Sequence, residues 1–146
     1  MGDKIMFRQL GPDDLDLLLS VPEGLFDKPL DPRQSRAFLD DPLHETVLAF
    51  DGELAVGMAT GTVLLHPDKE PSMFVNEVGV REEWQRRGIG SAVTGRLFQI
   101  ARARGCDGIW LGTELDNVPA IALYRRLGGD EVQGVYFGWD GALDPD

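Results

Sequence analysis

The dipeptide Asp51-Gly52 constrains the fold more than any other feature, because it separates two apolar runs. Asp-Gly between apolar segments is the strongest short-range signal for a β-hairpin. We therefore expect antiparallel strands over Thr46–Phe50 and Leu54–Leu65. Later in the chain, apolar runs of strand length alternate with segments of helical period. This order predicts an α/β chain with a mixed sheet covered by helices.

The remaining elements are expected from apolar periodicity and from turn and capping residues. Helical spacing from Val93 to Ala101 predicts a long helix that ends at Gly105. We expect one domain over residues 1–146, with a mixed twisted sheet of about six to seven strands and four helices. The other expected strands are Ile5–Gln9, Met73–Val80, Ile109–Leu111 and Val132–Trp139, and the other helices run from Gly11 to Leu19, Pro32 to Leu39 and Val118 to Leu127.

Charge and composition restrict the classes of partner. The net charge of -11 argues against a nucleic-acid partner and is compatible with a cationic small substrate. The alternative explanation is that the negative charge only keeps the protein soluble. No apolar run is long enough for a membrane helix, and the N-terminus lacks a secretory pattern. Cys106 is the single cysteine, and no Cys/His cluster has metal-ligand spacing. We expect a cytoplasmic protein with no metal and no membrane contact.

The stretch REEWQRRGIGSA, Arg81–Ala92, lies between an expected strand and an expected helix. A helix start offers free backbone N–H groups to an anion, and glycines at 88 and 90 let an anion approach them closely. Valine at 93 excludes the dinucleotide pattern G-x-G-x-x-G, and no Gly-Lys-Ser/Thr follows for a P-loop. Spacing alone leaves two interpretations equally open: an anion site, or a tight turn with solvated arginines.

Residues Gln85–Gly90, QRRGIG, match the Q/R-x-x-G-x-G/A motif of the GCN5-related N-acetyltransferases. Residues Asn117–Gly128 resemble that family's N-x-x-A-x-x-x-Y-x-x-L-G segment, and the expected element order is also similar. The resemblance implies a GNAT domain with acetyl-CoA as cofactor, its pyrophosphate on the turn and its pantetheine arm along the preceding strand. The cofactor-binding residues so implied are Val78, Gly79, Val80, Gln85, Arg86, Arg87, Gly88, Ile89, Gly90, Ser91, Asn117, Ala120 and Tyr124.

Acetyl transfer to an amine needs a group that takes the ammonium proton and a group that protonates the departing thiolate. Glu77 lies inside the apolar strand, where many family members carry a base, so it is expected to be the general base, directly or through a water. The alternative is an acid that faces solvent or pairs with a neighbour. Tyr124 is expected to be the general acid, and the alternative is a core aromatic.

Four further segments, RQLGPDDLDLLL, LFD, AFDGELAVG and PAIALYRRLGG, are similar to the aminoglycoside 3-N-acetyltransferases of type I. That resemblance implies a polycationic acceptor amine, whose ammonium groups require carboxylates. Asp116 has an alternative role as a helix cap, and Asp27 as a solvated loop residue. The expected acceptor-binding residues are Asp27, Glu77, Glu114 and Asp116.

Two other functions stay open. One is a GNAT enzyme that acetylates a polyamine or a protein amine. The other is an acyl-CoA-binding module without activity, against which the presence of both Glu77 and Tyr124 counts. The oligomeric state is also open, a homodimer being one expectation, and His44 and His66 receive no role.

Overall fold

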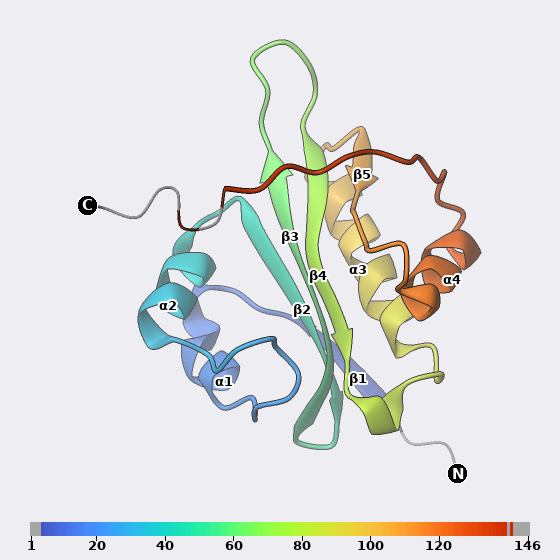
Figure 1. Cartoon of the computed structure of the whole chain (residues 1–146). Helices are drawn as coiled ribbons and strands as arrows, with labels where there is room; N and C mark the ends of the chain where they lie inside the picture. Colours follow the sequence, from blue (N-terminus) through green and yellow to red (C-terminus); the bar gives the residue numbers. More distant parts are fainter. Residues whose placement is uncertain (1–3, 140, 142–146) are drawn as a thin grey trace.

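The computed structural model describes residues 4–139 and 141, and its centre is one mixed sheet in the order β1-β2-β3-β4-β5 (Figure 1). β1 to β4 pair antiparallel in succession, whereas β4 and β5 pair parallel. The expected hairpin is confirmed, with Gly52 at φ +62° in its turn. The strands are Ile5–Gln9 (β1), His44–Asp51 (β2), Leu54–Leu64 (β3), Ser72–Val80 (β4) and Gly108–Trp110 (β5).

Helices cover both faces of the sheet (Figure 1). A 3₁₀ turn, Pro12–Asp14, precedes α1 (Leu15–Leu19), which lies with α2 (Pro32–Asp40) on one face. α3 (Ile89–Ala103) and α4 (Val118–Arg126) lie on the other, and a second 3₁₀ turn, Glu82–Trp84, leads from β4 toward α3. β3 is central, and most of its residues are buried because helices cover it on both sides.

Two apolar cores result, one on each face. Leu48, Ala55 and Met58 pack with residues of α1 and α2. Val47 and Val56 pack with α3 through residues such as Leu97 on the opposite face. Alternate residues of β2 and β3 therefore serve different cores, as the period-2 geometry of a strand requires.

Local chemistry explains where α2 and α4 begin. The side chain of Asp31 accepts a hydrogen bond from the N–H of Gln34 at 2.9 Å, and Pro32 occupies the first helical position. Asn117 caps α4 in the same way through the N–H of Ala120 at 3.3 Å. The expected starts of both helices are therefore confirmed.

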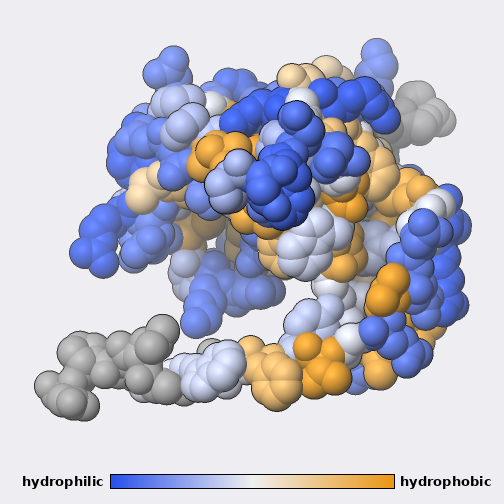
Figure 2. Space-filling view, turned by 90° about the horizontal axis from the view of Figure 1, so that it is seen from above, coloured by the Kyte–Doolittle hydropathy of each residue, from blue (hydrophilic) through white to orange (hydrophobic). Residues whose placement is uncertain are grey.

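The strand expected over Val132–Trp139 is wrong, because residues 131–139 form no strand in the part of the chain that the structure describes. β5 has only three residues, so it offers no edge long enough to pair with an eight-residue strand. The segment instead crosses the end of the sheet (Figure 1), where its first part lines a cavity with β5 and α4, and another part stands away from the body of the molecule (Figure 2). The described sheet thus has five strands rather than six or seven.

Candidate active site

β4 contains a bulge at the position of the expected general base. In its pairing with β3, Glu77 lies opposite Thr60 and Val75 lies opposite Gly61, so Asn76 is an extra residue. A bulge of this kind leaves one residue unpaired and changes which face the following side chains occupy.

The bulge decides which face Glu77 serves. Val75 precedes it and is buried in the core against α3, and Val78 and Val80 follow it and pack against the same core. Strict alternation from Val75 would also have placed Glu77 in that apolar core. Because of the extra residue, Glu77 faces α1 and α2 instead. Gly79 faces the same way, since a Cβ there would come 3.2 Å from the carbonyl oxygen of Leu25.

Glu77 lines a cavity of about 690 Å³ between the sheet and the α1–α2 region, which we call the acceptor cavity. Its floor is a row of Thr46, Thr60 and Glu77 on three neighbouring strands. Its charged lining consists mainly of carboxylates, with one lysine. The acidic, basic and imidazole-bearing residues among those that line it are Asp27, Lys28, Asp31, Asp41, His44 and Glu77.

The environment of Glu77 favours its protonated form. Partial burial raises the pKa of Glu77 above its ordinary value, and the negative charge of Asp27 raises that pKa further. A carboxylate with a raised pKa is a stronger base once ionised, which suits proton removal from an ammonium group. Asp27, expected to bind the acceptor, thus lies in the same cavity as Glu77.

The other side of β4 offers a free strand edge. β5 pairs only with Ser72–Phe74, so the rest of β4, through Val80, has no strand partner on that side among the described residues. Backbone N–H and C=O groups at such an edge are available to an extended ligand. Val78, Gly79 and Val80, expected to contact the pantetheine arm, lie in this unpaired part.

The turn between β4 and α3 has the backbone geometry of an anion site. Arg86 at φ +65° and Gly88 at φ +81° both adopt left-handed conformations. The first helical bond of α3 runs from the N–H of Ala92 to Gly88, so the N–H groups of residues 89–91 precede it. A Cβ on Gly88 would meet no atom within 4 Å, which leaves open space over these amides. Arg86 and Arg87 are exposed beside them.

Two side chains hold this turn in place. Gln85 donates from Nε2 to the carbonyl oxygen of Val80 at 3.0 Å. Trp84 donates from Nε1 to Oδ2 of Asp51 at 2.8 Å, which ties the turn to the β2–β3 hairpin. The turn therefore presents its amides on a braced backbone, as the binding of a diphosphate requires.

The turn also lies against α4. A Cβ on Gly90 would come 2.8 Å from Cδ1 of Leu123, so the start of α3 approaches α4 closely. Ser91 and Ala120 are half-buried in the two helices, and Ile89 is buried in the core. The two motifs thus lie next to each other in space. Their residues expected to bind the cofactor belong to β4, to α3 with the turn before it, and to α4.

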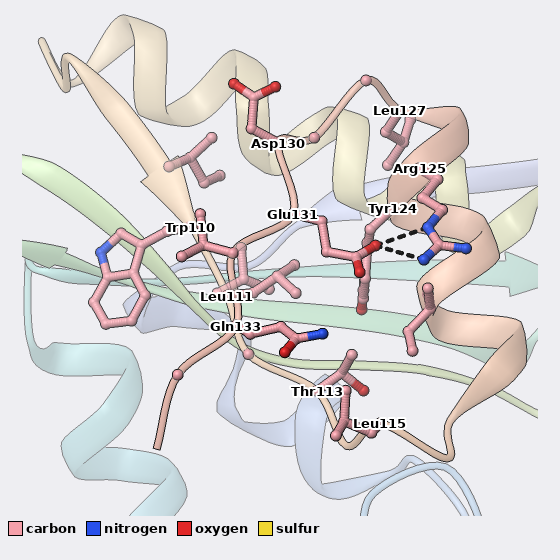
Figure 3. Close-up of a pocket in the computed structure, with 18 of the residues that line it drawn as sticks. Trp110, Leu111, Thr113, Leu115, Tyr124, Arg125, Leu127, Asp130, Glu131 and Gln133 are labelled. Carbon is pink, nitrogen blue, oxygen red and sulfur yellow. Dashed lines mark hydrogen bonds and ion pairs between the residues drawn. The ribbon is translucent and has the colours of Figure 1, made fainter. Parts of the chain in front are cut away.

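Tyr124 lines a second cavity, of about 520 Å³, between β5, α4 and the segment that follows α4 (Figure 3). Apolar neighbours such as Leu111 and Leu127 surround it, and this burial raises the pKa of Tyr124. An ion pair of 2.7 Å between Arg125 and Glu131 joins α4 to the segment that closes the cavity. Tyr124 therefore stays protonated at neutral pH and can donate a proton.

Two expected acceptor residues lie elsewhere. Glu114 and Asp116 are exposed in the connection between β5 and α4, and they line neither cavity. Asn117, not Asp116, is the side chain that caps α4. The acceptor cavity instead receives Asp31 and Asp41, which the sequence analysis did not single out. The expected strand began at Thr46, whereas β2 begins at His44, so the sequence did not place His44 on the same face as Thr46.

Neither a metal site nor a membrane span is found in the described residues. No group of three His, Cys, Asp or Glu side chains within residues 4–139 could hold a metal ion. Within the same part of the chain, no helix has the length and apolar character needed to cross a membrane.

Comparisons with known proteins agree on one family. The sequence model of the acetyltransferase (GNAT) family matches residues 14–129. Mycothiol acetyltransferase of Saccharopolyspora erythraea is 38% identical over 84 residues, which are 58% of this chain and 24% of that protein. Ribosomal protein bS18-alanine N-acetyltransferase of Escherichia coli is 33% identical over 85 residues, 58% of this chain and 53% of the relative. The chain thus spans about a quarter to a half of these curated relatives.

Solved structures share the fold over nearly the whole chain. An aminoglycoside acetyltransferase from an uncultured soil metagenomic sample, in complex with sisomicin, has a TM-score of 0.82 at 20% identity. The match covers 92% of this chain and 95% of that one.

Proposed function

Since the chain belongs to the acetyltransferase (GNAT) family, we propose that it transfers the acetyl group of acetyl-CoA to a primary amine of a polycationic small molecule. The observation that carries this proposal is the bulge at Asn76, which turns Glu77 into an acidic cavity beside the free edge of β4. An amine bound in this cavity would lie on the face of β4 that is turned toward α1 and α2. A thioester bound along the free edge of β4 would approach that amine from the β5 side.

The residues of the two motifs fit acetyl-CoA. The amides at the start of α3, with Arg86 and Arg87, are placed for a diphosphate, and the edge of β4 suits the pantetheine arm. When bound, acetyl-CoA supplies the activated acetyl group. Glu77 removes the proton from the acceptor ammonium, and Tyr124 protonates the departing sulfur. The pKa directions of both side chains suit these roles.

An aminoglycoside is the acceptor we favour, with acetylation at the 3-N position. The excess of carboxylates around the acceptor cavity supports a substrate with several ammonium groups, because a negative cleft concentrates cations. The fold shared with the sisomicin complex is consistent with that class. Among the acids expected to bind the acceptor, Asp27 lines the same cavity as Glu77, whereas Glu114 and Asp116 do not line it.

A protein amine is the second candidate, because one relative is named as an alanine N-acetyltransferase of a ribosomal protein. That acceptor needs one α-amino group and a groove for the following peptide. The carboxylate-lined cavity favours the polycation over this alternative.

The test is thiol release from acetyl-CoA with sisomicin, kanamycin, spermidine and a short peptide that begins with alanine. Turnover on the two aminoglycosides, followed by mapping of the acetylated nitrogen, is the expected result. Turnover only on the peptide would transfer the assignment to a protein amine. Binding of acetyl-CoA without turnover on any amine would contradict the transferase proposal.

A further inference from the structure

The acceptor cavity has a second polar end, formed by Asp41 and His44. Asp41 follows the last residue of α2, His44 is the first residue of β2, and both line the cavity. Nδ1 of His44 lies 3.3 Å from Oδ1 of Asp41. Neither the family motifs nor the proposed chemistry uses this pair.

Local contacts fix how the pair faces the cavity. Oδ1 of Asp41 also accepts the N–H of Leu43 at 2.8 Å. This backbone hydrogen bond is the main cause that lowers the pKa of Asp41, so its carboxylate is ionised. Oδ2 is the oxygen left to other partners. Nδ1 of His44 is buried without a hydrogen-bond partner among the described residues, the ring of Phe38 lies 5.2 Å away between centroids, and a third of the His44 side chain is exposed.

The pair lies at a defined separation from Glu77. Thr46 of β2 pairs with Thr60 of β3, which in turn pairs with Glu77 of β4. His44 lies two residues before Thr46 in β2, on the same face of the sheet. Strand spacing and rise place the Cα atoms of His44 and Glu77 about 12 Å apart. A single amino group cannot contact both ends of the cavity, whereas a molecule with two amino groups several bonds apart can.

The charged residues that line the cavity as a whole favour a cation. Asp27 and Asp31 come from the α1–α2 connection, and Glu77 comes from β4. Lys28 is the one opposing charge among the described lining residues, and it belongs to the same connection as Asp27. An ammonium group at Asp41 would therefore be stabilised both by its direct partner and by the remaining field of the cavity.

We propose that Asp41 and His44 form a second amine-binding subsite, which holds a non-reacting ammonium group of the acceptor while another amine reacts at Glu77. Oδ2 of Asp41 and Nε2 of His44 accept its N–H groups. The proposal rests on the proposed transferase function for its kinetic consequence, but the subsite itself is defined by binding. It makes the enzyme selective for acceptors with at least two amino groups.

The test compares 1,6-diaminohexane with hexylamine, and includes sisomicin as a larger polyamine. Asp41→Asn keeps an oxygen for Leu43 and removes the charge, and His44→Phe keeps the ring against Phe38 and removes Nε2. Each variant is expected to raise KM for the diamine and for sisomicin about ten-fold, with kcat within two-fold and KM for hexylamine unchanged. Asp40→Asn is the matched control, because Asp40 pairs with Arg36 outside the cavity.

Calorimetric binding of the same amines without acetyl-CoA separates this proposal from the transferase assignment, and thermal unfolding checks that each variant folds. Binding of 1,6-diaminohexane or sisomicin that depends on Asp41, in a protein without turnover, would keep the subsite and remove the transferase function. Normal turnover with equal KM in the wild type and both variants would overturn the subsite. An absence of diamine and sisomicin binding to the wild type would overturn it as well.

Discussion

Arg81 donates from Nη1 to the carbonyl oxygen of Glu23 at 2.9 Å, and so ties the end of β4 to the connection between α1 and α2. The same guanidinium reaches the carbonyl oxygens of Pro22 and Ala55 at 2.7 Å each. The loop that carries Asp27 into the acceptor cavity is therefore held by one side chain that belongs to neither motif.

Arg81→Met is expected to lower the free energy of unfolding by about 2 kcal/mol, because backbone carbonyls lose a charged donor. KM for the acceptor should rise while KM for acetyl-CoA changes little. Chemical denaturation and steady-state kinetics measure both. Arg33→Met, an exposed arginine of α2 outside the cavity, is the control. Equal acceptor KM in the two variants would contradict a positioning role for Arg81.

Glu77→Gln should reduce kcat/KM by about 10²-fold or more near neutral pH, where the acceptor is mostly protonated. The acid limb of the wild-type pH profile should lie above the ordinary range of a glutamate, since burial and then Asp27 raise the pKa of Glu77. Asp27→Asn removes the second cause, so it should move that limb to lower pH. A limb that stays in place would show that Asp27 does not act on Glu77.

The same shift has a consequence for stability. The pKa of Glu77 is raised in the folded state, first by burial and then by Asp27. The stabilisation that protonated Glu77 gives the folded state is therefore fully present below the pKa of the unfolded chain, and it is lost as pH rises through the folded-state pKa. Glu77→Gln should therefore unfold at the same temperature as the wild type in acid and at a higher temperature at neutral pH. Thermal unfolding across this range measures the difference, and a variant less stable at pH 7 would contradict it.

Tyr124→Phe should lower kcat by about 100-fold and leave the dissociation constant of acetyl-CoA within two-fold of the wild type. Burial raises the pKa of Tyr124, so the wild-type hydroxyl is protonated throughout the working range. Tyr136→Phe removes a hydroxyl from the same cavity and should change neither quantity. Equal activity of the two variants would assign Tyr124 to packing alone.

Gly90→Val should weaken acetyl-CoA binding by several-fold, because its side chain would displace Leu123 and move α4 away from the start of α3. Gly95→Val is the matched change in the same helix, where a Cβ meets nothing within 4 Å. Titration with acetyl-CoA should separate the two variants. Similar affinities of the two variants for acetyl-CoA would mean that Leu123 moves aside without disturbing the turn before α3.

Local sequence patterns were sufficient to predict most of the helices and strands. The expected helices from Pro32 and from Val118 begin where the sequence predicted, because their caps, Asp31 and Asn117, act within one turn. The expected helix from Gly11 was only partly correct, since the chain first makes a 3₁₀ turn and α1 begins at Leu15. The apolar run Met73–Val80 also placed Glu77 on a strand, directly before the turn that carries the QRRGIG motif.

Features that depend on distant partners were not predictable. The apolar and aromatic residues of Val132–Trp139 favour a strand but carry no information about a free sheet edge, and β5 is too short to supply one. Asp41 and His44 meet the acceptor cavity only because β2 lies two strands from β4. The polar residue Asn76 gave no sign of being unpaired, because a bulge is defined by the opposing strand.

The bulge gives β4 one residue, Asn76, that has no opposing residue in β3. A substitution at Asn76 keeps the backbone count and should leave the faces of the strand as they are. Loss of that one residue would make the pairing regular, with Val75 still opposite Gly61 and Glu77 still opposite Thr60, so neither side chain would change its face. An in-frame deletion of that single codon should therefore leave the acid in the cavity and Val78 in the core against α3.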